Sequence, residues 1–432
     1  MALPLSDVLN PGVRKRELFG WAMYDFANSG YTTVVITAVF AAYFVGGVAG
    51  GASWAPLAWT VALSISYAIV MLTMPGLGAW ADRHGAKKRL LMAVTLGCVL
   101  TTAALAWAGP GGVALAMLLV IVSNTFYTYG ESLTAAFLPE LARAEAMGKV
   151  SGWGWGFGYV GGMLTLAACL AYVLHAKALG QPASQFVPVT LLITAAVYGL
   201  AACLTFALLG ERAQARAESS ERAGLRDGLA RMLASLRKAR RYRDFSWLLA
   251  CTVAYQGGVA VAITLAAIYA EQVIGFVQQE TMVLILVLNI AAAAGAFACG
   301  HLQDRIGHKL TLGITLVGWV LTCIIAALAT SKGQFWVAAS IAGICMGSSQ
   351  SAGRAMVGLF APAQNLAEFF GLWTFATRLA SIVGPLAYGL ITWATGGNQR
   401  VAIACTTVLF VLGLLALTRI DMQRGRAARL VA

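Results

Sequence analysis

Long apolar segments alternate with short polar ones along the whole chain, and this pattern predicts helices that cross a membrane. Most of the apolar runs are about 20 to 28 residues long, which at 1.5 Å rise per residue spans a hydrocarbon core of roughly 30 Å. We identify twelve such runs, at approximately 18–47, 55–81, 90–108, 113–138, 151–176, 186–209, 245–274, 281–300, 310–330, 335–360, 369–395 and 401–419. The expected fold class is an all-α integral membrane protein with twelve transmembrane helices.

Composition agrees with this interpretation, and the charges add an orientation. The chain is 59% hydrophobic and 11% charged, with a mean hydropathy of +0.77. Loops on one side of the predicted membrane hold nearly all of the lysines and arginines, whereas the other side has only Lys177, Lys332 and Arg400. Because cytoplasmic loops retain positive charge, we expect both termini to be cytoplasmic and the protein to lie in the inner (plasma) membrane. The net charge of +13 follows from this topology and suits anionic lipid, so no nucleic-acid partner is expected.

The chain contains two copies of one short sequence. GLGAWADRHGAKK at 76–88 matches CGHLQDRIGHKLT at 299–311, and each copy follows the second run of its half. Repeats of this kind are typical of transporters whose halves rock against each other. We predict a six-helix bundle at 1–210, a cytoplasmic linker at 211–244 and a second six-helix bundle at 245–432. The linker has leucines on one helical face and arginines on the other, which predicts an amphipathic helix on the membrane surface.

The duplicated segments are interpreted as gating loops that do not bind substrate. Their aspartates are expected to cap the following helix or to pair with nearby arginines, and so to hold an outward-open state. The predicted gating residues are Gly78, Asp82, Arg83, Gly85, Asp304, Arg305 and Gly307.

With this duplicated loop and its six-plus-six layout, the chain resembles the major facilitator superfamily. It is more closely similar to the vacuole-effluxer-like branch, which includes fungal vacuolar amino-acid effluxers. That resemblance rests on WAMYDFANSGY (21–31), AAFLPELA (135–142), VSGWGWGFGYVGG (150–162) and AEFFGLWTFATRLASIVGP (367–385). The seventh helix departs from the branch, because Gly257 stands where an acidic residue is usual. The resemblance implies transport across a membrane, with amino-acid export as one form of it.

Polar residues recur at helical spacing within the first, fourth, seventh and tenth runs, and each such helix therefore has one polar face. A polar face is costly against lipid, so these faces are expected to surround a common cavity. In the major facilitator fold these four helices surround the central cavity, and Arg378 in the eleventh run is expected to point inward as well. The predicted substrate and coupling residues are Asp25, Asn28, Asn124, Tyr127, Glu131, Tyr255, Gln256, Gln350, Arg354 and Arg378.

Distances from the helix ends place Asp25, Glu131 and Arg354 in one layer, about 9 to 11 Å from the cytoplasmic boundary. Glu131 and Arg354 also occupy equivalent places in the two halves. We therefore predict that Glu131 pairs with Arg354, and that Arg378 pairs with Asp25 or with an anionic substrate. The alternative is that these charges form ion pairs that only fix helix register, and that Asp25 snorkels to the interface or caps its helix.

Two features of the fifth run have structural explanations. Its glycines, between Gly152 and Gly162, predict a close helix crossing. Trp153 and Trp155 are expected to anchor the helix at the membrane interface.

The sequence predicts a secondary active transporter, not an enzyme, that moves a small polar or zwitterionic solute by alternating access with proton coupling. Intramembrane Glu131 or Asp25 would carry the proton. No cofactor, metal site or nucleotide-binding loop is expected, and the expected partners of a monomeric protein are the solute, protons and membrane lipids. Two alternatives stay open: a lipid or amphiphile flippase of the same fold, and a transporter-like receptor that signals through the linker.

Overall fold

A computed structural model describes residues 8–52, 54–212, 237 and 241–430, and these residues form helices joined by short loops. The predicted linker helix lies outside the described residues. The long helices of the first half are α1 (Lys15–Tyr31), α3 (Ala55–His84), α4 (Lys87–Ala104), α5 (Val113–Ala135), α7 (Met147–Ala178) and α8 (Ala183–Leu208). Those of the second half are α10 (Arg243–Tyr269), α11 (Gln278–Ile306), α12 (His308–Leu328), α13 (Lys332–Phe360), α14 (Leu366–Ala394) and α15 (Gln399–Thr418).

Shorter elements extend or connect these helices. A π-helix (Thr32–Ala38), α2 (Phe40–Tyr43) and a second π-helix (Phe44–Val48) continue α1, and a π-helix (Ala270–Ile274) continues α10. Helix α6 (Leu138–Leu141) follows α5, and α16 (Met422–Leu430) ends the described chain. Short 3-10 turns occupy Leu105–Trp107, Ala144–Ala146 and Ala363–Asn365.

The helical membrane class predicted from the sequence is confirmed. Within the described residues, 11 helical segments are long and apolar enough to cross a membrane. Helix α13 is 29 residues long and coincides with the tenth predicted run, but it is not among the 11. Its sequence includes the polar stretch GSSQSAGR, which contains Gln350 and Arg354. This stretch makes α13 less apolar than the 11 segments that qualify as membrane spans. The twelfth crossing therefore stays a prediction.

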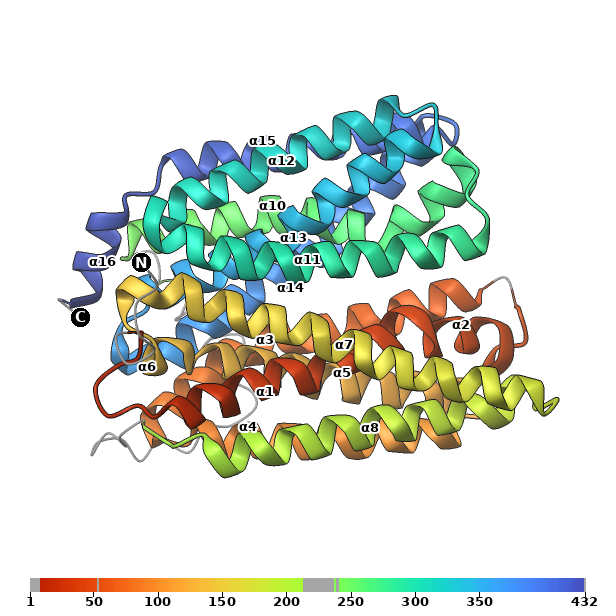
Figure 1. The fold of residues 1–432 in the computed structure, drawn as a ribbon, viewed down its shortest axis with the longest axis horizontal. Coiled ribbons are helices and arrows are strands. Elements are labelled where there is room, and N and C mark those ends of the chain that lie inside the picture. Colours follow the sequence, from red (N-terminus) through yellow and green to blue (C-terminus); the bar gives the residue numbers. More distant parts are fainter. Residues whose placement is uncertain (1–7, 53, 213–236, 238–240, 431–432) are drawn as a thin grey trace.

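Helices from the two halves of the sequence gather on opposite sides of the molecule. Figure 1 shows α1 to α8 together on one side and α10 to α15 together on the other. Helices α6 and α16 lie at the same end of this bundle. We call this the terminal end. The boundaries of the two predicted bundles remain a prediction.

The two halves contact each other mainly through α7 with α11 and α3 with α14, and also through α7 with α13 and α5 with α14. Glycines allow the backbones to approach closely at these crossings. A Cβ atom on Gly78 of α3 would lie 2.3 Å from the Ala367 carbonyl oxygen of α14. A Cβ atom on Gly152 of α7 would lie 2.4 Å from the Ala296 carbonyl oxygen of α11. The close crossing predicted from the glycines of the fifth run is thus confirmed.

Gly78→Ala is expected to lower the free energy of unfolding by about 1–3 kcal/mol, because the new methyl group overpacks the contact between α3 and α14. Gly389→Ala on α14 is the matched control, since a Cβ atom there meets nothing within 4 Å. That variant should be neutral, or stabilising by up to about 1 kcal/mol through helix propensity. Chemical unfolding of the purified protein in detergent measures both, and equal effects would contradict the tight crossing.

Candidate functional site

Two ion pairs inside the bundle each join a helix of the first half to a helix of the second. Asp25 on α1 accepts a hydrogen bond from Arg354 on α13, with 2.6 Å between Oδ2 and Nη1. Glu131 on α5 accepts one from Arg378 on α14, with 2.5 Å between Oε2 and Nη2. The four residues come from four helices, so the two pairs join the halves through charges inside the bundle.

Arg354 is held by more groups than its carboxylate partner. Its Nε donates to Ser151 Oγ at 3.1 Å and its Nη2 donates to the Ser151 carbonyl oxygen at 2.7 Å, both on α7. Its guanidinium lies 4.9 Å from the ring centroid of Trp21 and 5.3 Å from that of Trp155. A guanidinium between two indole faces gains cation–π attraction in addition to its hydrogen bonds. With its side chain only 4% exposed, Arg354 is a fixed contact between α13, α1 and α7.

The predicted partners of these charges were wrong. Glu131 pairs with Arg378 and not with Arg354, and Arg354 takes Asp25. Asp25, Glu131 and Arg354 do line one cavity, which agrees with the prediction that they lie at a similar depth. Depth does not determine which helices are neighbours, however. Helix α13 contacts α7, which packs against α1, and this brings Arg354 to Asp25. Helix α14 contacts α5, and this brings Arg378 to Glu131.

The two carboxylates line a single small cavity of about 30 Å³ together with Asn28, Tyr127 and Arg354. This volume has room for one or two water molecules. Trp155 and Trp373 also line the cavity, and the indole N–H of each is buried without a hydrogen-bond partner in the described structure. Two unused donors in a polar cavity suit an acceptor such as a carboxylate, a carbonyl or water.

The other predicted site residues make contacts within their own half. Asn124 on α5 donates to Ser66 Oγ on α3 at 2.6 Å. Gln256 on α10 donates to Gln350 Oε1 on α13 at 2.6 Å, and its amide lies 3.5 Å from Tyr255 Oη. These residues do not line the small cavity. The bonds of Asn124 and Gln256 instead join neighbouring helices of one bundle.

Several residues of the site were missed or misinterpreted in the sequence. Trp155 is not an interface anchor, because it lies against Arg354 inside the bundle. Ser151 and Trp155 are four residues apart on α7, and Trp21 precedes Asp25 by four on α1, so helical spacing places each pair on one face. Aromatic residues in line with an intramembrane charge were the signal that could have identified them.

The duplicated loops make matching contacts across the two halves at the terminal end. Asp82 accepts a hydrogen bond from the Glu368 N–H at 2.9 Å, in the first turn of α14. Asp304 accepts from the Gly148 and Lys149 N–H groups at 2.8 Å each, in the first turn of α7. Each aspartate therefore caps a helix of the opposite half. The expectation that they cap the following helix or pair with arginines was wrong, since the amides at an opposite helix N-terminus are closer partners.

The glycines of these loops have backbone conformations that end one helix before the next begins. Gly85 follows α3 with φ of 58°, and Gly307 follows α11 with φ of 97°, values that favour glycine. Arg83 and Arg305 are exposed, and within the described residues Arg83 donates only to the Ala79 carbonyl oxygen of its own helix. The loop arginines therefore do not hold the halves together in this conformation.

Comparison with known proteins gives a family. A family model described as vacuole effluxer Atg22 like matches residues 43–429. An uncharacterized MFS-type transporter, YxiO, of Bacillus subtilis (strain 168) is 28% identical over 404 residues, which cover 92% of this chain and 93% of that protein. Autophagy-related protein 22 of Cryptococcus neoformans var. neoformans serotype D (strain B-3501A) is 25% identical over 177 residues, 37% of this chain and 32% of that protein.

A solved structure agrees with these sequence matches. The human organic anion transporter MFSD10 (TETRAN) has a TM-score of 0.74 to this chain at 16% identity, covering 93% of this chain and 99% of that one. At that identity the likeness shows the fold, which is that of the major facilitator superfamily. Since the family model covers most of the sequence, the chain is a membrane transporter protein of the major facilitator superfamily and belongs to the vacuole effluxer Atg22-like family.

Proposed function

We propose that this protein moves a small zwitterionic solute, amino-acid-like in its charges, across the inner membrane by alternating access coupled to protons. The observation that carries the proposal is the accessible ion pair between Glu131 and Arg378. The Glu131 side chain is 30% exposed and the Arg378 side chain 15%, against 13% for Asp25 and 4% for Arg354. The pair that a solute can reach is therefore the one between α5 and α14.

Arg378 and Glu131 have bonding capacity left for a solute. One guanidinium nitrogen of Arg378 bonds Glu131, while its buried Nε has no hydrogen-bond partner in the described structure. A guanidinium binds a carboxylate through two parallel hydrogen bonds, so a solute carboxylate can replace Glu131 as the acceptor of the single bond from Arg378. Glu131 is then free to accept an ammonium group or a proton. A zwitterion satisfies both residues at once.

Proton coupling follows from the same exchange. When a solute carboxylate occupies Arg378, Glu131 loses its cationic partner inside the bundle. An unpaired buried carboxylate is costly, and protonation removes that cost. If Glu131 takes up a proton when the solute carboxylate occupies Arg378, solute and proton bind together. If the ammonium group of the solute occupies Glu131 instead, solute and proton replace one another.

We propose that the terminal end of the bundle is closed in this conformation and that it faces the cytoplasm. Asp82 and Asp304 cap helices of the opposite half there, and the Asp25–Arg354 pair joins α1 to α13 at the small cavity. Movement of solute to that side requires these contacts to break together. The positive charge of the loops supports the cytoplasmic assignment.

The names of related proteins support a solute that carries an acid group. The family is named for vacuole effluxers, and the human structure is titled an organic anion transporter. Only the second description names a charge, and it suits a solute whose acid group meets Arg378. The small cavity beside Glu131 adds the indole N–H groups of Trp155 and Trp373, which can donate hydrogen bonds to a carboxylate or a carbonyl.

Counterflow in proteoliposomes tests this function. Vesicles with purified protein are loaded with one unlabelled amino acid from a panel and given the same amino acid with a radiolabel outside. Transient accumulation of label is expected for at least one amino acid, and Arg378→Lys should reduce it by tenfold or more because lysine cannot form the two-bond contact. Arg16→Lys, an equal change at an exposed arginine at the start of α1, should leave it unchanged.

Other outcomes would identify the alternatives. Binding of an amino acid in a thermal-shift assay without counterflow would indicate a receptor and contradict transport. Movement of a labelled phospholipid between leaflets, with no counterflow for any amino acid, would indicate a flippase.

A further inference from the structure

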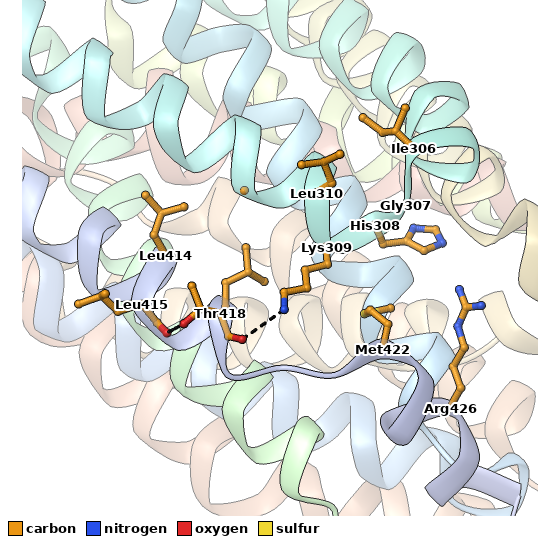
Figure 2. Close-up of a pocket in the computed structure, with 12 residues that line it drawn as sticks. Ile306, Gly307, His308, Lys309, Leu310, Leu414, Leu415, Thr418, Met422 and Arg426 are labelled. Atoms are coloured by element: carbon orange, nitrogen blue, oxygen red, sulfur yellow. Dashed lines mark hydrogen bonds between the residues drawn. The ribbon is translucent and has the colours of Figure 1, made fainter.

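A second cavity lies outside the transport pathway, at the terminal end of the second half. Its volume is about 560 Å³, and it is bounded by the start of α12, the end of α15 and helix α16. Figure 2 shows its lining residues. They are Ile306, Gly307, His308, Lys309, Leu310, Gly313, Leu414, Leu415, Leu417, Thr418, Met422 and Arg426. We call it the α12–α16 groove.

The groove has an apolar part and a basic part. Leu414 and Leu415 lie at one end in Figure 2, while His308 and Arg426 lie together at the other. Leu310 and Leu415 are more than half exposed, at 56% and 58%. They continue the apolar faces that α12 and α15 turn toward the lipid. One end of the groove therefore suits a hydrocarbon chain, and the other suits an anion.

Lys309 has a hydrogen-bond donor to spare in this groove. Its ammonium group donates to the Thr418 carbonyl oxygen at 3.2 Å and to the Ile420 carbonyl oxygen at 2.6 Å. An ammonium has three donors, so one remains. Within the described residues no carboxylate lies at ion-pair distance from Lys309 or from Arg426.

The first half differs at the equivalent position. Lys87 corresponds to Lys309 in the duplicated loop, but Lys87 is buried and makes an ion pair with Glu140. Glu140 directly follows Pro139, and the residue after the matching Pro362 is Ala363. The second half thus keeps the cation and lacks the acid that would neutralise it.

Helix α16 is fixed firmly enough to hold Arg426 in place. Arg424 donates two hydrogen bonds to the Asp244 carboxylate, at 2.7 and 2.8 Å. Asp421 accepts from the Gln423 and Arg424 N–H groups, and these bonds hold its pKa below the usual value. Asp244 and Asp421 are therefore both engaged, and neither lies at ion-pair distance from Arg426. A third acid, Asp304, lies 3.8 Å from His308 Nε2 and accepts hydrogen bonds from the Gly148 and Lys149 N–H groups. Gly307 leaves the first turn of α12 without a side-chain cap at the same end of the groove, which adds partial positive charge.

We propose that the α12–α16 groove binds an anionic phospholipid, with the phosphate at Arg426 and Lys309 and an acyl chain along Leu310 and Leu415. An amphiphile is favoured over a free anion because most of the lining is apolar and continuous with the lipid-facing surface. A lipid bound here would tie α16 to α12 and α15, and so stabilise the second half at its terminal end.

Purified full-length protein in a neutral detergent tests the proposal with three ligands. Native mass spectrometry and thermal melting are recorded with phosphatidylglycerol, with phosphatidylcholine and with inorganic phosphate. Phosphatidylglycerol is expected to bind and raise the melting temperature, whereas the other two should do neither at the same concentration. Equal binding of phosphatidylcholine, or equal stabilisation by inorganic phosphate, would overturn the proposal.

Two variants locate the site. Arg426→Gln should weaken the apparent affinity for phosphatidylglycerol about fivefold, the effect of one basic residue near an anionic headgroup. Arg16→Gln removes the same charge from an exposed arginine at the start of α1 and should have no effect. Gly313→Phe should exclude the acyl chain while leaving the arginine in place, since a Cβ atom at Gly313 meets only Leu417 at 3.7 Å. Unchanged lipid binding in both Arg426→Gln and Gly313→Phe would place the lipid elsewhere.

Discussion

Arg354→Ala is expected to lower the free energy of unfolding by about 3–5 kcal/mol, because it leaves the Asp25 carboxylate buried without its cation. The same change removes two hydrogen bonds to Ser151 and the contacts with two indole rings. Solute transport should be lost as well, since this pair connects α13 to α1 at the closed end. Unfolding in detergent and counterflow in proteoliposomes measure the two effects.

A double variant separates the ion pair from the rest of the Arg354 contacts. Asp25→Asn with Arg354→Ala should be more stable than Arg354→Ala alone, because no unpaired charge remains. Arg305→Ala on the same end of the molecule is the control. Arg305 is exposed, and its removal should change stability by no more than about 0.5 kcal/mol. If the double variant were as unstable as Arg354→Ala alone, the unpaired charge of Asp25 would not contribute to the loss in free energy of unfolding.

The fold could be predicted from the sequence because its strongest physical signals are local. The length of an apolar run sets whether it can cross a membrane, and a duplicated loop sets the repeat. Helix α13 shows the limit of the first signal. It is 29 residues long, yet its polar residues make its mean hydropathy too low for it to be recognised as a membrane span. The residues that serve the interior of the protein are the ones that weaken its membrane signal.

Helical spacing identified part of the cavity lining but not the ion-pair partners. Of the ten predicted residues, five line the small cavity, and Trp155 and Trp373 line it without having been predicted. Helical spacing correctly placed Asp25 and Glu131 toward one interior cavity, because a polar face has few stable positions in a membrane. Which arginine each would meet depends on helix neighbours, and these follow from glycine crossings such as Gly152 with α11. The caps made by Asp82 and Asp304 depend on contacts between halves, which no local pattern in either half contains.

The two ion pairs differ in ways that suggest a division of roles. Arg354 is held by Asp25, by Ser151 and by two aromatic rings, so it has little freedom to exchange partners. Arg378 makes one bond to Glu131 and lies 5.3 Å from the Tyr67 ring centroid, with Nε unused in the described structure. A residue that must release its partner in each transport cycle is better placed at the second pair. We therefore expect proton coupling at Glu131 and not at Asp25.

Glu131→Gln is expected to abolish accumulation driven by a pH gradient while leaving counterflow in place. Glutamine keeps the size and the acceptor oxygen of the side chain but stays neutral, so it resembles the protonated carboxyl. With one proton per solute, a gradient of one pH unit is worth about 1.4 kcal/mol and supports about tenfold accumulation. The variant should reach the same solute concentration on both sides. Proteoliposomes with an imposed pH gradient and a radiolabelled solute measure the ratio.

Asp25→Asn gives the contrast that makes this result informative. Because Asp25 pairs with the less exposed arginine, its neutralisation should lower stability and reduce counterflow and driven accumulation by similar factors. A coupling residue instead loses driven accumulation alone. Full tenfold accumulation by Glu131→Gln would rule out the role of this carboxylate in coupling. The side on which the wild-type protein accumulates solute also distinguishes symport from antiport, because a symported solute gathers on the alkaline side and an antiported one on the acidic side.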